Sequence, residues 1–164
     1  VKNGKTGLIK LKMNSLTNYN IIETLYDASR AGVKIQLIVR GVCCLIPGIN
    51  GMSENIDVIS VVDKFLEHTR MMIFENDGDP LIYISSADWM TRNLDNRVEV
   101  SCPIYDPDIK QDLLETFAIT WADNVKARVL NGKEPNTYKK SSLKQRRTQT
   151  DLYNYYKNKL ALEG

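Results

Sequence analysis

The only histidine of the sequence, His68, stands two residues before Arg70 and seven before Glu75. An imidazole can exchange a proton or a phosphoryl group at neutral pH, because its unperturbed pKa is about 6.5. Side chains two residues apart on an extended strand point to the same face, so the imidazole and the guanidinium would lie side by side. His68 and Arg70 are therefore candidates for handling a phosphate group. By spacing alone, a solvated or hydrogen-bonded histidine at a helix end is the more common alternative.

Arg40 is a second candidate, because it directly follows the apolar run 33–39 and precedes a loop. Its guanidinium keeps its charge at any relevant pH, and its planar fork can bind two phosphate oxygens at once. The loop, residues 41–55, contains Pro47 and Gly48 among other residues that permit tight turns and close approach of a ligand to the backbone. The structural alternative is that Arg40 caps backbone carbonyls.

Three polar residues further along have to be weighed against structural alternatives. Ser86 and Asp88 lie in a polar segment between two predicted strands, and Glu99 alternates with valines on the second strand. The structural alternatives are that Ser86 and Asp88 form a turn and that Glu99 lies on the solvent-facing side of its strand.

Alternating strands and helices must position these residues. Alternating or continuous apolar residues predict strands at 7–13, 33–39, 71–74, 81–85 and 97–102. Apolar residues at helical spacing predict helices from a cap at Thr17 or Asn18 to Gly32, over 58–67, from Asp106 to near Asp123, and around 152–160. Arg40 then stands at the carboxyl end of the second strand.

The order strand, helix, strand at the start of the chain predicts a parallel pair with a right-handed crossover. The nearly continuous apolar character of residues 33–39 indicates a strand that is buried on both faces. We therefore expect an α/β fold with a mixed, mostly parallel sheet flanked by helices. Residues 1–130 are expected to form the domain, and residues 131–164 a tail with a terminal helix and a basic cluster of Lys139, Lys140, Lys144, Arg146 and Arg147.

The composition limits the alternatives. A chain of 164 residues fits one domain, and a net charge of +2 gives no field over the whole protein, so binding of polyanions depends on local clusters. Three cysteines are too few for a disulfide framework and fit reduced thiols in a cytoplasm. No apolar run approaches the roughly 20 residues that cross a bilayer. Because the chain opens on Val1, we expect it to be a fragment of a longer polypeptide.

The candidate motifs resemble those of the phospholipase D superfamily. His68, Arg70 and Glu75 are similar to its HxK(x)4D signature, with arginine in place of lysine and glutamate in place of aspartate. The stretch 85–88 is similar to its GSxN stretch, and Glu99 follows on the next predicted strand. Members of this superfamily use one reactive histidine from each of two repeats. A phosphodiesterase built on His68 alone would therefore have to act as a homodimer.

Longer segments resemble the last domain of the polyphosphate kinases. Six segments carry the resemblance and span residues 11–128, about three quarters of the chain: LKMNSL, AGVKIQLIVRGVCCLIPG, SENI, FLEH, YISSADWMTRNLDNRVEV and DNVKAR. Many separate matches in one order are far more specific than a short motif. The resemblance implies a phospholipase D-like domain of a phosphotransferase that moves the terminal phosphate of ATP reversibly onto polyphosphate. The phosphohistidine of that reaction would lie on an upstream domain.

The resemblance also implies roles for particular residues. Arg40 and His68 would face the nucleotide, and Glu99 would lie beside the histidine. The predicted catalytic residues are thus His68, Arg40 and Glu99, and the predicted nucleotide- and phosphate-binding residues are Arg40, His68, Arg70, Ser86 and Asp88. We expect no metal ligand in this chain, since the Mg²⁺ of the parent enzyme would be bound upstream.

The partners expected from the resemblance are ATP, ADP, polyphosphate, the upstream domains and further copies of the full-length enzyme, but no nucleic acid. The protein would be cytoplasmic, with peripheral association with the inner membrane left open, and the isolated fragment would be inactive. Two other functions stay open at this point. One is the dimeric phosphodiesterase, and the other is a non-catalytic module that binds polyanions through the loop and the basic tail.

Overall fold

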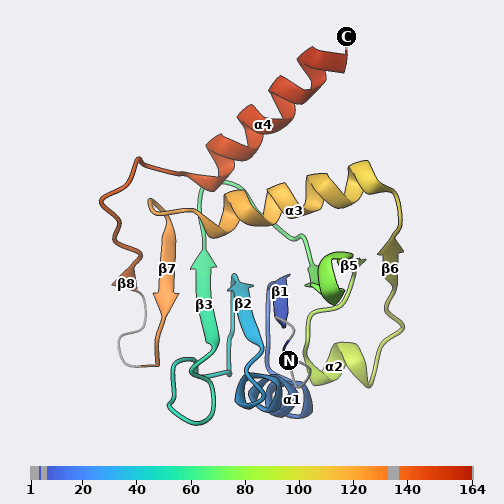
Figure 1. Cartoon of the computed structure of the whole chain (residues 1–164), viewed down its shortest axis with the longest axis vertical. Helices are drawn as coiled ribbons and strands as arrows, with labels where there is room; N and C mark the ends of the chain where they lie inside the picture. Colours follow the sequence, from blue (N-terminus) through green and yellow to red (C-terminus); the bar gives the residue numbers. More distant parts are fainter. Residues whose placement is uncertain (1–3, 5–6, 133–136, 164) are drawn as a thin grey trace.

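A computed structural model of the chain describes residues 4, 7–132 and 137–163. Its strands form one sheet in the order β6-β5-β4-β1-β2-β3-β7-β8 (Figure 1). The strands are β1 (Leu8–Met13), β2 (Lys34–Val39), β3 (Ile56–Val61), β4 (Met71–Phe74), β5 (Leu81–Ser85), β6 (Ser101–Ile104), β7 (Ala127–Leu130) and β8 (Thr137–Tyr138). The helices are α1 (Tyr19–Arg30), the single-turn α2 (Thr91–Leu94), α3 (Pro107–Trp121) and α4 (Thr148–Glu163).

The sheet is mixed, as predicted, and helices flank it. Strand β2 pairs in parallel with β1 and with β3, whereas the other five pairings of the described strands are antiparallel. The α/β class is confirmed, but the expectation that parallel pairs would predominate is wrong. Parallel neighbours need a long crossover, and only α1 and the loop 41–55 provide one, while short connections such as the turn at Asn76–Gly78 return the chain antiparallel.

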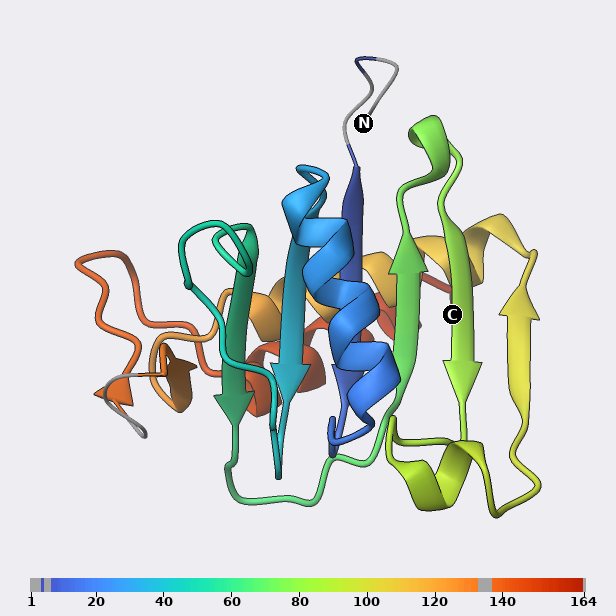
Figure 2. The same ribbon diagram turned by 90° about the horizontal axis from the view of Figure 1, so that it is seen from below.

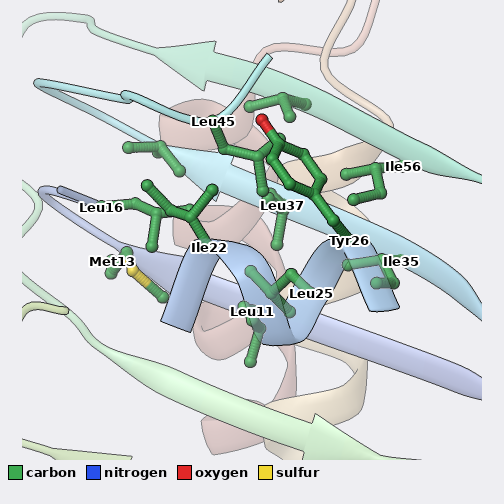
Figure 3. Packing of buried hydrophobic residues seen from close by; sticks show 12 residues of the cluster. Leu11, Met13, Leu16, Ile22, Leu25, Tyr26, Ile35, Leu37, Leu45 and Ile56 are labelled. Carbon is green, nitrogen blue, oxygen red and sulfur yellow. The ribbon is translucent and has the colours of Figure 1, made fainter. Parts of the chain in front are cut away.

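Apolar residues pack on both faces of the sheet. On one face, Leu25 and Tyr26 of α1 pack against Leu11 and Leu37 of the central strands (Figure 3). Helix α3 covers the opposite face (Figure 2), where the fully buried Phe117 belongs to a second cluster. Ile35, Leu37 and Val39 of β2 belong to the first cluster and Ile38 belongs to the second, which confirms that the end of this strand is buried on both faces.

The predicted helix ends are confirmed where capping chemistry is present. The Oδ1 atom of Asn18 accepts a hydrogen bond from the backbone N–H of Ile21 at 3.1 Å, so Asn18 is the N-cap of α1. Gly32 follows the helix with φ of +87°, a conformation that residues with a side chain rarely adopt. Asp106 caps α3 in the same way, and Pro107 occupies its first turn.

The helix predicted over 58–67 is wrong. Residues Ile56–Val61 form strand β3, because its β-branched side chains fill both clusters: Val58 packs on the α1 side and Ile59 on the α3 side. Residues 62–70 follow without regular secondary structure. Phe65 and Leu66, which completed the apparent helical period, are 66 % and 72 % exposed.

Strand β6 begins four residues later than the predicted start at residue 97, and Glu99 lies before it rather than on it. The strand is at the edge of the sheet. Pro103 has no backbone N–H to donate, and an edge strand tolerates this on its unpaired side. The short strands β7 and β8 were not predicted, whereas the terminal helix α4 is confirmed. Within the described residues, no helix has the length and apolar character that a membrane span requires.

Candidate functional site

The topology brings the predicted site residues to one edge of the sheet, at the bottom of Figure 2. Strands β1 and β2 end at this edge because they are parallel, β4 and β6 begin there, and β5 ends there. Arg40 follows β2, and Asp88 follows β5 by three residues. His68 precedes β4, and Glu99 precedes β6. Residues up to 59 positions apart in the sequence, such as Arg40 and Glu99, therefore share this edge.

Asp88 is the centre of a hydrogen-bond network at this edge. Its Oδ1 atom accepts from the backbone N–H groups of Asn14 at 2.7 Å and Ser15 at 3.2 Å, and its Oδ2 atom accepts from Arg70 Nη2 at 3.0 Å. Burial would raise the pKa of Asp88, but the hydrogen bonds from Arg70, Asn14 and Ser15 outweigh burial and lower it. The carboxylate is thus charged at neutral pH and orients the groups around it.

Arg70 joins this carboxylate to the histidine. Its Nη1 and Nη2 atoms lie 3.2 Å and 3.1 Å from the two ring nitrogens of His68. A neutral imidazole has one acceptor nitrogen, so only one of these two contacts is a hydrogen bond at a time. The prediction that the two side chains lie on the same side is confirmed, although they belong to the irregular segment before β4.

Arg40 joins the network from the other side. Its Nε atom donates to Oδ1 of Asn14 at 2.9 Å, and the Asn14 side-chain amide lies 3.3 Å from Oδ1 of Asp88. A continuous path of polar contacts therefore runs from Arg40 through Asn14, Asp88 and Arg70 to His68. In the described part of the chain, the terminal nitrogens of Arg40 have no hydrogen-bond partner, which leaves its fork available to an anion.

Glu99 is held beside the path rather than against the histidine ring. Ser86 donates a short hydrogen bond to Glu99 through its hydroxyl, and the Asn93 side chain donates another at 2.6 Å. These two bonds lower the pKa of Glu99, with smaller electrostatic contributions from Arg97 and Arg70. The structure thus brings Ser86 and Glu99 together but does not place Glu99 in contact with His68.

Two residues of the site were missed from the sequence. Asn14 connects the two halves of the path, and Lys12 on β1 is 6 % exposed with its Nζ atom 3.4 Å from the Glu67 carboxylate. Burial lowers the pKa of Lys12 and nearby Arg40 adds to this, while Glu67 opposes it. From the sequence, Lys12 was assigned only to the predicted strand 7–13 and was given no role in the site. Folding instead covers Lys12 with the segment that carries Glu67.

A largely apolar groove of about 970 Å³ opens next to the histidine. Lys12, Glu67 and His68 lie along it, and residues of α3 and α4 form its other walls. His68 itself is exposed, so a ligand can reach its ring. Among the residues that the structure describes, no three His, Cys, Asp or Glu side chains are grouped as a metal site would require.

The chain matches proteins of one family along nearly all of its length. The sequence model of the family described as polyphosphate kinase C-terminal domain 2 matches residues 1–150. Polyphosphate kinases from Vibrio parahaemolyticus and Escherichia coli are 50 % and 45 % identical over 158 and 162 residues. Each alignment covers 96 % of this chain but only 23 % and 24 % of the relative. The chain therefore spans about a quarter of the length of these curated relatives.

Solved structures give the same result. The crystal structure of polyphosphate kinase from Porphyromonas gingivalis superimposes with a TM-score of 0.94 at 46 % identity, covering 96 % of this chain and 24 % of that one. A phospholipase D family member from Salmonella typhimurium, at 18 % identity and a TM-score of 0.57, shares the fold over 76 % of this chain and 82 % of its own. The family match reaches residue 150, and the predicted boundary at residue 130 stays a prediction. On these matches and on its phospholipase D-like fold, the chain belongs to the polyphosphate kinase C-terminal domain 2 family.

Proposed function

We propose that this chain forms one side of the active site of a polyphosphate kinase. In this proposal the enzyme moves the terminal phosphoryl group of ATP reversibly onto polyphosphate. The phosphohistidine and the residues that bind Mg²⁺ belong to other parts of the polypeptide. The enzyme works in the cytoplasm as an oligomer of the full-length chain, and attachment to the inner membrane is not required by the mechanism.

The observation that carries the proposal is the continuous polar path from Arg40 to His68. Phosphoryl transfer passes through a loose transition state, and the protein contributes mainly by positioning the reactants and supplying positive charge. The unpaired fork of Arg40 meets that need, with charge-assisted hydrogen bonds that contribute about 1.5 to 3 kcal/mol each. Asp88 holds Arg70 against the imidazole, and Asn14 holds Arg40. The distance between the guanidinium groups of Arg40 and Arg70 is therefore fixed before a phosphate binds.

His68 has the chemistry for a second role. A protonated imidazole has no acceptor for Arg70, so in the proposal the charged ring turns from Arg70 toward the phosphate. It can then hold a phosphate oxygen or donate a proton to the leaving oxygen, and general acid catalysis typically contributes about 10² to 10⁴ in rate. In the proposal Arg70 and Ser86 add hydrogen-bond donors for phosphate. In the proposal Glu99 supports the site through its hydrogen bonds with Ser86 and Asn93.

The test is the substitution Arg40→Ala in the full-length enzyme that carries this chain. We expect kcat/KM for ATP to fall at least about 100-fold, since an arginine that stabilises a phosphoryl transition state contributes at least that much. Arg40→Lys should recover only part of the loss, because an ammonium cannot form the two parallel bonds. Arg30→Ala, which removes an exposed arginine paired with Asp27 on α1, is the matched control. Unchanged turnover in a folded Arg40→Ala enzyme would remove Arg40 from the site.

A further inference from the structure

The segment that carries His68, residues 62–70, is named here the His68 segment. It connects β3 to β4 without regular secondary structure. In the described residues, no backbone-to-backbone hydrogen bond involves residues 62–69. A segment without such bonds opens easily unless side chains hold it. The position of the His68 ring therefore depends on side-chain contacts from other elements.

Two contacts come from the first turn of α4 and from the residue just before the helix. Arg147 donates two parallel hydrogen bonds to the carboxylate of Asp63, at 2.8 Å and 2.7 Å, and this carboxylate is 3 % exposed. Gln149 binds both backbone groups of Phe65: its Oε1 atom accepts from the N–H at 3.0 Å, and its Nε2 atom donates to the carbonyl at 2.8 Å. The ion pair lowers the pKa of Asp63, so its carboxylate is charged at neutral pH.

Thr148 lies between Arg147 and Gln149, and it holds the start of the helix against the sheet. The backbone N–H and the hydroxyl of Thr148 both donate to Asp123 Oδ2, at 2.7 Å and 2.8 Å, and Thr148 is fully buried. Asp123 also accepts three backbone hydrogen bonds from the turn that leads into β7. Thr148 thus fixes the helix start, while Arg147 and Gln149 reach the His68 segment from a rigid base.

We propose that Arg147 and Gln149 are positioning residues for His68. The inference rests on the proposed role of His68 in phosphate handling. Phe65 is three residues from His68, and Lys12 holds Glu67 from the sheet side at 3.4 Å. The segment is thus held at Asp63, Phe65 and Glu67, the last of which is adjacent to the histidine. The C-terminal part of the chain contributes to the site by fixing a residue that lies about 80 positions earlier.

The first measurement is amide hydrogen exchange of the full-length enzyme, read by mass spectrometry on peptides that cover residues 62–70. Arg147→Ala and Gln149→Ala should each raise exchange of the Phe65 amide, whose N–H donates to Gln149, on the order of tenfold, with little change in the central strands. The matched controls are Arg146→Ala and Gln145→Ala, which change the same residue types next to these positions. Unchanged exchange in both test variants would overturn the proposal.

The second measurement is a double-mutant cycle with His68→Ala. We expect Arg147→Ala to lower kcat on the order of tenfold with nearly the same KM for ATP, because a misplaced catalytic group costs that much or more. The loss should disappear in the His68→Ala background. An equal loss there, or an equal loss in Arg146→Ala, would contradict positioning and point to general destabilisation or bulk charge. If His68→Ala itself leaves turnover unchanged, the proposed function fails, and the exchange measurement alone decides whether α4 holds the segment.

Discussion

Asp88 is anionic at an edge that we propose binds phosphate, and its surroundings explain how that is possible. Both of its oxygens accept hydrogen bonds from Asn14, Ser15 and Arg70, so little of its charge faces a ligand. The guanidinium groups of Arg40 and Arg70 would otherwise repel each other. The Asp88 carboxylate on the path between them allows both to stay charged. At the scale of single residues, Asp88 therefore organises the site, and Arg40, Arg70 and His68 contact the phosphate in our proposal.

Asp88→Asn should disrupt the site. The amide oxygen can still accept from Asn14 and Ser15, but the amide nitrogen would face Arg70, and both groups are donors. The Arg70 and Asp88 side chains are only 13 % and 8 % exposed, so we expect a loss of about 3 kcal/mol in the free energy of unfolding. Urea denaturation measures this loss. Asp79→Asn, which alters an exposed pair with Lys110, should change stability by less than about 1 kcal/mol, and an equal effect of both variants would contradict the role of Asp88.

The residues that the sequence identified and those that it missed differ in one physical respect. Arg40, His68 and Arg70 follow or precede strands whose ends could be located from apolar runs, so their shared edge was predictable. Asn14 occupies an equivalent position after β1 but has an uncharged side chain, which gave no reason to assign it a role. Lys12 is buried because the segment with Glu67 covers it. The two residues are 55 positions apart, and the residue pattern of neither segment indicates that they are in contact.

At the scale of elements, the connection from α3 to β7 and α4 depends on one buried carboxylate. Asp123 accepts hydrogen bonds from the backbone of Val125, Lys126 and Ala127 and from both donors of Thr148. Burial would raise the pKa of Asp123, but these hydrogen bonds outweigh it and the pKa is lowered. The stabilisation is therefore complete above the ordinary pKa of aspartate and is lost as the pH falls through the lower value of the folded state.

Asp123→Ala should lower the free energy of unfolding by at least about 2 kcal/mol, because it leaves several buried N–H groups without acceptors. It should also flatten the acid limb of a plot of stability against pH, since the titrating group is gone. Thermal or chemical denaturation between about pH 3 and 7 measures both effects. Asp27→Ala removes an exposed pair with Arg30 and should leave stability within about 1 kcal/mol. An unchanged acid limb in Asp123→Ala would show that other carboxylates control it.

Elements could be predicted where their own residues determine the structure. They could not be predicted where the adjacent strands of the sheet determine it. Helices α1 and α3 carry capping residues and an apolar face, and both formed as expected. Residues 56–61 have a spacing that fits either period, and their place between β2 and β7 made them a strand. Strands β7 and β8 have four and two residues, so too few side chains alternate for a pattern to appear.

At the scale of the whole molecule, the chain spans about a quarter of the length of its curated relatives. At the edge of the sheet, His68 is exposed and Arg40 is half-buried. A phosphate bound here would keep part of its hydration shell, and each charge-assisted bond would be weakened by water and salt. The edge is therefore expected to bind nucleotide weakly until another part of the polypeptide covers it.

The isolated chain should accordingly bind ATP or ADP with a dissociation constant on the order of 1 mM, since two or three exposed charge-assisted bonds barely exceed the entropic cost of association. Titration followed by ³¹P and amide NMR measures this, and Arg40→Ala should abolish the shifts at residues 40 and 68, whereas Arg30→Ala should not. Incubation with ATP labelled at the terminal phosphate should leave the chain unlabelled, because the nucleophile belongs to another domain in our proposal. Stable label recovered on His68 would instead make this histidine the acceptor, and the chain would then be a complete catalytic unit rather than one side of a site.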